Sequence, residues 1–167
     1  QRDYERFLQL LYITNSPESR HRSNLISPTL ESVMQLPRPH TLVNIGAYCL
    51  MPNHFHLLLQ EKSGKGIAKF MQKLGIAYAM YFNIRHHRVG NLFVKPFRSL
   101  HVSDDRYFQR ALQYIHCNPA ELYEPGWKVG SIKNPHALQK QLLVYPYSSF
   151  ADHAREKTVV RPILDES

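Results

Sequence analysis

A chain of 167 residues, 43% of them hydrophobic, is long enough for one domain with a core and too apolar for wholesale disorder. Lysine and arginine total 21 against 13 acids, a net charge of +8, and such a surface attracts polyanions such as nucleic acid. No apolar run approaches the roughly 20 residues that cross a bilayer, and the charged start is unlike a signal peptide. With Cys49 and Cys117 as its only cysteines, we expect a cytoplasmic protein without disulfides or membrane contact.

The first forty residues predict a helix followed by an irregular segment. Apolar side chains of Tyr4–Ile13 recur on one helical stripe. Residues 15–40 are polar and interrupted by prolines, so we interpret them as an irregular insertion. Within it, Ser27 as N-cap and Pro28 at the first helical position predict the start of a short helix.

A β-hairpin that carries two histidines is predicted next. Thr41–Met51 and His54–Gln60 have strand character and are separated by two turn residues. Side chains alternate between the two faces of a strand, so His54 and His56 face the same way. The side chains expected to face the opposite way, into a core, are those of Phe55, Leu57 and Leu59.

The second half of the chain predicts a long helix, a strand and another helix. Ile67–Arg85 has apolar residues at helical spacing, and Leu92–Val102 is predicted as a strand whose Pro96 implies an edge position or a bulge. Ser103 is expected to cap a helix that ends near Asn118, because a residue before proline avoids helical dihedrals. The side chains expected to face the core from this helix are those of Tyr107, Phe108, Ala111, Leu112 and Ile115.

This order of elements predicts an α+β fold. Helix, strand, strand, helix, strand and helix, completed by a strand before the first helix, would give a ferredoxin-like antiparallel sheet with helices packed on one face. That first strand is not in the sequence. We therefore expect one domain over residues 1–167 that lacks its first strand and carries the insertion at about 15–40.

A tyrosine and an asparagine on the last predicted helix complete a candidate site. Tyr114 and Asn118 are four residues apart, so they project from the same side of the helix. Presented to the two histidines, this set offers metal ligands from His54, His56 and Asn118, and a nucleophile from Tyr114. Such a set suits phosphoryl transfer, because a divalent cation neutralises the charge that develops on a phosphodiester under attack. The expected ion is Mg²⁺ or Mn²⁺.

Each of these residues also has a purely structural interpretation. Histidine pairs are more often structural than metal-bound, a single tyrosine such as Tyr114 is usually a core residue, and Asn118 before a proline can simply cap a helix. His116 lies on a different side of the helix and is left outside the site. Aromatic side chains such as Tyr123 and Trp127 can stack on unpaired bases, although packing is their commoner role.

Basic residues outside the site form a candidate DNA surface. A solvated charged face is the alternative interpretation, because composition alone does not distinguish the two. The residues of this candidate surface are Lys65, Lys69, Lys73, Arg85, Arg88, Lys95 and Arg98.

Four segments together resemble the single-tyrosine HUH transposases. Tyr48–Leu59 is similar to their HUH segment, and Asp105–Pro119 is similar to the helix that carries their catalytic tyrosine. Asn91–Ser99 and Tyr145–Phe150 also match the pattern of the family. Since asparagine rather than glutamine follows the tyrosine by four, the branch that the chain most resembles is the REP-associated tyrosine transposases.

The resemblance implies a metal-dependent endonuclease and strand transferase for DNA transposition and recombination. Its fold would be the HUH-nuclease form of the ferredoxin-like arrangement, and its partner would be single-stranded or hairpin DNA from palindromic repeats, at the bacterial nucleoid. By position, the resemblance implies metal ligation by His54, His56 and Asn118. It also implies attack by Tyr114, which leaves a 5′-phosphotyrosine and a free 3′-hydroxyl. Monomer and homodimer both stay open, since related transposases include both.

Two other functions stay open. A catalytically inactive, domesticated protein that recognises repeat hairpins would bind DNA without cutting it. A metal-dependent hydrolase that uses water would cut DNA without a protein–DNA link, with Tyr114 as a bystander.

Overall fold

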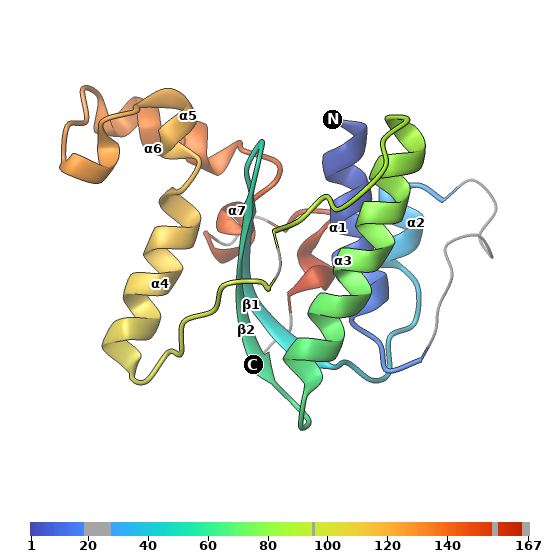
Figure 1. Cartoon of the computed structure of the whole chain (residues 1–167). Helices are drawn as coiled ribbons and strands as arrows, with labels where there is room; N and C mark the ends of the chain where they lie inside the picture. The colour runs from blue at the N-terminus through green and yellow to red at the C-terminus, as the bar shows by residue number, and fades with distance from the viewer. Residues whose placement is uncertain (19–27, 95, 155–156, 165–167) are drawn as a thin grey trace. The chain divides into compact units, whose positions relative to one another are not determined.

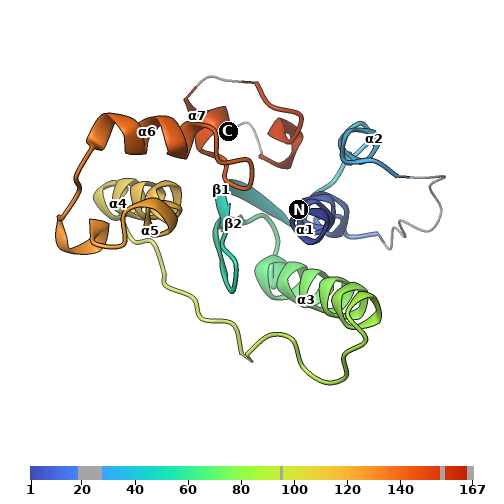
Figure 2. The same ribbon diagram turned by 90° about the horizontal axis from the view of Figure 1, so that it is seen from above.

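The computed structural model describes residues 1–18, 28–94, 96–154 and 157–164. These residues form two compact units. The first unit holds residues 1–44 and 59–101, and the second holds residues 45–58 together with the described residues from 102 onward. Figures 1 and 2 show the helices and strands of both units.

Helices dominate the first unit. α1 (Arg2–Thr14) packs against both α2 (Leu30–Met34) and α3 (Gly66–Arg85), as Figure 2 shows nearly end-on. The two long helices predicted from apolar periodicity are thus confirmed, each with its bounds within one residue at the C-terminal end. None of the described helices is long and apolar enough to cross a membrane.

The short helix within the predicted insertion has a different cap from the one expected. The Thr29 hydroxyl accepts a hydrogen bond from the Ser32 amide at 3.1 Å, and the Ser32 hydroxyl accepts one from the Thr29 amide at 3.0 Å. This reciprocal pair satisfies two amides that have no partner inside a helix, so the helix starts at Leu30. Ser27, the expected cap, lies outside the described residues.

A buried asparagine joins the end of α1 to the start of the first strand. The Asn15 Oδ1 accepts hydrogen bonds from the amides of Leu42 and Val43, both at 3.0 Å, and its Nδ2 donates to the Val43 carbonyl at 2.9 Å. The side chain is fully buried. Buried backbone groups need such partners because water cannot replace them, so Asn15 fixes the point where the strand begins.

We expect Asn15→Ala to lower the free energy of unfolding by about 3 kcal/mol or more, because three buried backbone groups lose their partner. Urea unfolding monitored by circular dichroism measures this loss. Asn44→Ala is the matched control, since the Asn44 Nδ2 donates to the Gln60 Oε1 at 2.9 Å at an exposed position. The control is expected to lose less than about 1 kcal/mol. Equal losses in the two variants would contradict the role given to Asn15.

The predicted hairpin is formed by β1 (Val43–Leu50) and β2 (Phe55–Glu61). A later segment pairs with β1 as well. The Leu50 amide donates to the Tyr147 carbonyl at 2.8 Å, and an antiparallel bridge joins Cys49 to Ser148.

The strand predicted at Leu92–Val102 is wrong, since its described residues form no strand. An extended segment becomes a strand only where a neighbour pairs with its backbone, and Pro96 removes one of the donors that pairing needs. Within the described residues the sheet holds β1 and β2. The α+β class is therefore confirmed, whereas the ferredoxin-like arrangement is not shown.

The core of the second unit lies between the hairpin and α4 (Asp105–Cys117), which run side by side in Figure 1. Its buried residues are Ala47, Cys49, Met51, Leu58, Ile115 and Tyr145. Ala111 and Leu112 pack against this cluster from α4, as predicted. Phe108 was expected to join them but is exposed.

The prediction of which β2 side chains are buried is wrong by one residue along the strand. Leu58 is the buried residue of this strand, while the residues expected in the core are only half-buried. Leu58 lies two positions after His56 and therefore on the same face of the strand. The face that carries the histidines thus also packs into the core, because α4 covers it. The half-buried residues are Phe55, Leu57 and Leu59.

α4 starts and ends close to its predicted limits. Its N-cap is Asp104 rather than Ser103, since the Asp104 Oδ1 accepts the Tyr107 amide at 2.8 Å while the Ser103 hydroxyl donates to Asp104 at 3.0 Å. A carboxylate at this position also interacts favourably with the helix dipole. The helix ends at Cys117 with Asn118 as its C-cap, so the predicted end is confirmed. The reason given for it is wrong, because Asn118 keeps helical dihedrals (φ −57°, ψ −38°) although a proline follows it.

Short helices follow α4 where the sequence predicted only a mixed region. They are α5 (Ala120–Tyr123), the 3₁₀ turn η2 (Trp127–Val129), α6 (Pro135–Leu143), α7 (Phe150–His153) and the 3₁₀ turn η3 (Arg161–Ile163). Ala120, Leu138 and Leu142 form a second buried cluster, against which Trp127 packs. This cluster anchors the turn that follows α5.

Candidate functional site

The hairpin turn presents His54 directly before β2. The Met51 amide donates to the His54 carbonyl at 2.8 Å, which closes the turn. The Tyr145 hydroxyl donates to the Leu50 carbonyl at 2.6 Å, so the later segment holds β1 where the turn begins. His54 is therefore held from both sides of the turn although it lies just outside the strand in which it was predicted.

His54 offers one ring nitrogen toward Asn118. Its Nδ1 lies 2.7 Å from the Asn53 Oδ1, and its Nε2 lies 3.4 Å from the Asn118 Oδ1. A neutral imidazole has one N–H, so donation from Nδ1 to Asn53 leaves a lone pair on Nε2. The lone pairs of His54 and Asn118 then face each other, an arrangement that a cation would satisfy. A hydrogen bond from the other ring nitrogen to an oxygen is the usual support of a metal-binding histidine.

His56 supplies a second nitrogen beside the first. The centroids of the His54 and His56 rings are 5.0 Å apart, and the His56 Nε2 is buried with no hydrogen-bond partner among the described residues. Burial, together with electrostatic interactions with His54 and Lys128, lowers the pKa of His56 and outweighs a hydrogen bond with Asn118 that acts in the opposite direction. The ring therefore stays neutral at physiological pH and keeps a lone pair available for a cation.

α4 brings Tyr114 and Asn118 to these histidines. The Tyr114 ring lies 5.2 Å from the His56 ring, edge to face. Ile115 is buried in the core, and because successive helical residues are about 100° apart, this sets the direction in which Tyr114 projects. Tyr114 is 45% exposed and so accessible to a large substrate, whereas Asn118 is fully buried.

The residues at this point fit a divalent cation. The His54 Nε2 and the Asn118 Oδ1 lie 3.4 Å apart, and the neighbouring His56 ring, 5.0 Å from that of His54, carries a buried Nε2 without a hydrogen-bond partner. The described residues contain no group of three or more His, Cys, Asp or Glu that could hold a metal. The amide oxygen of Asn118, which lies 3.4 Å from the His54 Nε2, would be the third protein ligand. Imidazole with carbonyl oxygen suits Mn²⁺, and Mg²⁺ would take more of its ligands from water and substrate.

His116 is engaged elsewhere, in keeping with its omission from the predicted site. Its Nε2 lies 2.9 Å from the Ser149 Oγ. Burial, with a smaller contribution from His153, lowers the pKa of His116 to about 4. His116 is thus a neutral residue that ties α4 to the segment beside β1.

Two residues beyond α4 lie near Tyr114 although the sequence assigned them no part in the site. The Trp127 ring is 6.4 Å from the Tyr114 ring, and the Lys128 Nζ is 5.9 Å from the centroid of the Trp127 ring. Trp127 packs in a cluster, the role that the sequence favoured for it. In the sequence, this turn is indicated only by the two glycines, Gly126 and Gly130, that flank a tryptophan and a lysine. Such a pattern does not predict that these two side chains lie near a tyrosine on another helix.

The described residues of the predicted DNA surface lie in the first unit. Lys73 donates to the carbonyls of Ser16 and Glu18, and the Arg85 Nε lies 3.0 Å from the Asp3 Oδ1. Lys95 lies outside the described residues. The exposed members of the set, for which DNA contact stays a prediction, are Lys65, Lys69, Arg88 and Arg98.

The fold and these contacts define an α+β protein with a candidate metal site beside an exposed tyrosine. The family model described as "Transposase IS200 like" matches residues 9–118. This is well over half of the chain, which therefore belongs to the IS200-like transposase family, the broad family that includes the REP-associated tyrosine transposases. The resemblance inferred from the sequence is confirmed at this level.

The match covers both the hairpin with its histidines and α4 with Tyr114 and Asn118. Membership implies DNA binding and a transposase-type nuclease activity, in a family of HUH nucleases that use a divalent metal. No curated protein and no solved structure matched the chain.

Proposed function

We propose that this protein cleaves and rejoins single-stranded DNA by forming a 5′-phosphotyrosine at Tyr114. The observation that carries the proposal is the 3.4 Å approach of the His54 Nε2 to the Asn118 Oδ1 next to His56, whose Nε2 is buried without a hydrogen-bond partner. An exposed tyrosine lies beside them, with its ring 5.2 Å from that of His56. Hairpin or palindromic repeat DNA is the proposed substrate, as expected for the branch of the family that the sequence most resembles.

In the cleavage step, the Tyr114 Oη attacks the phosphorus of a phosphodiester. The P–O3′ bond breaks, the departing 3′-oxygen takes up a proton, and the phenol proton passes to solvent. A divalent ion held by His54, His56 and Asn118 would supply positive charge that neutralises the phosphate under attack. Tyrosine has an ordinary pKa of about 10 and is a weak nucleophile, so its placement beside this charge matters.

The product suits a strand transferase better than a hydrolase. A phosphotyrosine keeps the energy of the broken phosphodiester, so a 3′-hydroxyl of the same or another strand can attack it and restore DNA. Water attack would lose that energy. The exposure of Tyr114 supports this function, because a second strand end must reach the same atom.

Incubation with a labelled single-stranded hairpin oligonucleotide and Mn²⁺, followed by a denaturing gel and peptide mass mapping, tests the proposal. We expect a covalent adduct on Tyr114 and a free 3′-hydroxyl on the released fragment. EDTA should prevent both. Retarded DNA with neither adduct nor cut would indicate an inactive repeat-binding protein, and cut DNA without adduct would indicate a hydrolase that uses water.

A further inference from the structure

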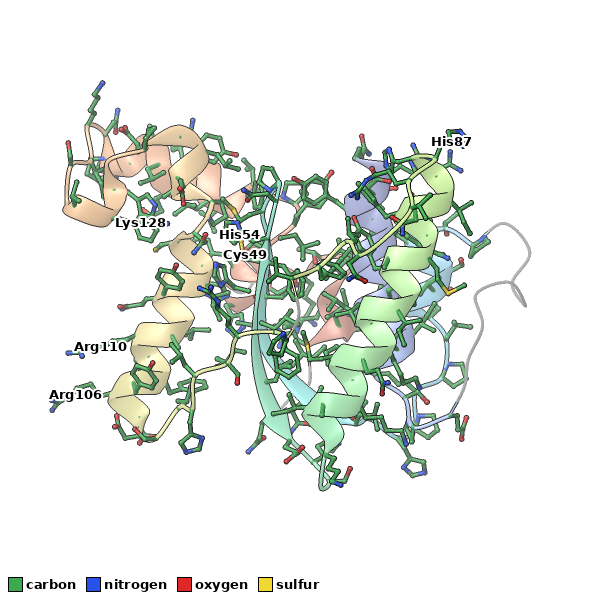
Figure 3. All side chains as sticks on the ribbon, in the orientation of Figure 1. Cys49, His54, His87, Arg106, Arg110 and Lys128 are labelled. Carbon is green, nitrogen blue, oxygen red and sulfur yellow. The ribbon has the colours of Figure 1, made fainter. Side chains whose placement is uncertain are left out.

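In the second unit an ammonium group lies beside Trp127, whose ring is near that of the candidate nucleophile Tyr114. The Lys128 Nζ is 2.7 Å from the Glu121 Oε2, and it lies 5.9 Å from the centroid of the Trp127 ring, which is itself 6.4 Å from that of Tyr114. Figure 3 shows Lys128 near the end of α4 at which His54 also lies. Arg106 and Arg110 project from the other end of that helix, away from the hairpin.

The turn that carries Lys128 is held firmly. The Trp127 amide donates to the Glu124 carbonyl and the Ser131 amide to the Gly126 carbonyl, both at 3.0 Å. Gly130 closes the turn with a φ of 80°, a conformation that favours glycine. Trp127 packs against the buried cluster of α5 and α6. The backbone of Lys128 is therefore fixed by the turn, whereas its side chain is held only by the ion pair with Glu121 and the contact with the Trp127 ring.

The charge of Lys128 is close enough to interact with the candidate nucleophile. The hydrogen bond to Glu121 raises the pKa of Lys128, and an electrostatic interaction with Tyr114 raises it further. The ammonium thus lies within electrostatic range of Tyr114.

Stability does not account for this ion pair. The side chains of Lys128 and Glu121 are each 45% exposed, and exposed ion pairs of this kind contribute little to folding. Such a pair is easily exchanged, because the lysine loses little when another anion replaces the carboxylate. A phosphate group, with more negative charge and several acceptor oxygens, is the anion that a lysine binds well.

We propose that Lys128 is a further catalytic residue, whose ammonium leaves Glu121 and binds a non-bridging oxygen of the scissile phosphate as Tyr114 attacks. This rests on the function proposed above and adds a positive charge supplied by the protein itself. The non-bridging oxygens carry the most negative charge in the transition state, where phosphorus is bound to both the attacking and the departing oxygen, so Lys128 acts more on the rate than on DNA affinity. Lys128 transfers no proton in this step.

Single-turnover adduct formation with saturating hairpin DNA and Mn²⁺ tests this role, with DNA affinity measured separately by fluorescence anisotropy. Lys128→Ala is expected to slow adduct formation roughly 10- to 100-fold while affinity changes less than about threefold. Lys128→Arg should recover part of the rate because it keeps the charge. Arg106→Ala, which removes an exposed charge from the far end of α4, should change neither quantity.

A substrate with a neutral methylphosphonate at the scissile position separates this role from a structural one. With that substrate the difference between the wild-type protein and Lys128→Ala should shrink, since the charge that Lys128 binds is gone. A Lys128→Ala rate equal to the wild-type rate, or equal losses of rate and affinity, would overturn the inference while leaving Tyr114 as nucleophile. If the wild-type protein itself forms no adduct, the proposed function fails, and the role of Lys128 fails with it.

Discussion

Tyr114→Phe should abolish the covalent DNA adduct and leave the affinity for hairpin DNA within about twofold of the wild-type value. The substitution removes one oxygen atom from an exposed ring, so the contact with the His56 ring is retained. Without that oxygen no phosphotyrosine bond can form, and the loss of cleavage should be complete within the detection limit. Denaturing gels measure the adduct, and anisotropy measures the affinity.

The control for this variant is Tyr123→Phe, which removes the hydroxyl of an exposed tyrosine on α5. It should form adduct at the wild-type rate. An adduct that persists in Tyr114→Phe would place the nucleophile on another residue, and mass mapping of that adduct would identify it.

His56→Ala should weaken Mn²⁺ binding by about 100-fold or more and reduce adduct formation to a similar degree. Loss of an outer-shell partner already costs 10- to 100-fold in metal affinity, and a direct ligand contributes more. The His56 Nε2 has no hydrogen-bond partner among the described residues, so the substitution breaks no protein hydrogen bond at that atom. Calorimetric titration of the DNA-free protein with Mn²⁺ measures binding independently of activity.

His136→Ala is the matched control, because His136 is an exposed histidine on α6. Its Mn²⁺ affinity should equal that of the wild-type protein. Unchanged affinity in His56→Ala would remove this histidine from the metal site. Thermal unfolding of both variants shows whether His56, which is half-buried, also contributes to folding.

The sequence predicted those features that depend on residues close together in the chain. The periodicity of α1 and α3 predicted them closely, and α4 ends where it was predicted to end, although Asn118 keeps the helical dihedrals that the following proline was expected to exclude. The spacing of Tyr114 and Asn118 along one helix, and of His54 and His56 along one hairpin, was enough to propose which side chains meet. The structure brings these four together, and their chemical roles stay predictions.

Features that depend on distant partners were not predictable in the same way. Leu92–Val102 has the composition of a strand, but pairing needs a neighbour that composition does not reveal. The side chain of Leu58 is buried because it packs against residues of α4, a helix more than forty residues later in the chain. Lys128 follows Trp127, which packs against a buried cluster that includes two residues of α6, and the sequence of that region predicted no such helix.

The pairing of the segment at residues 145–149 with β1 sets the order in which the site can be completed. The Tyr145 hydroxyl bond to Leu50 and the Ser149 hydroxyl bond to the Tyr48 amide join residues 95 and 101 positions apart. A ribosome releases the histidines, Tyr114 and Asn118 well before it releases these two residues. During synthesis the turn that holds His54 is therefore unsupported on one side until residues 145–149 have been made, so the candidate site becomes rigid only after all four of its residues are already part of the chain.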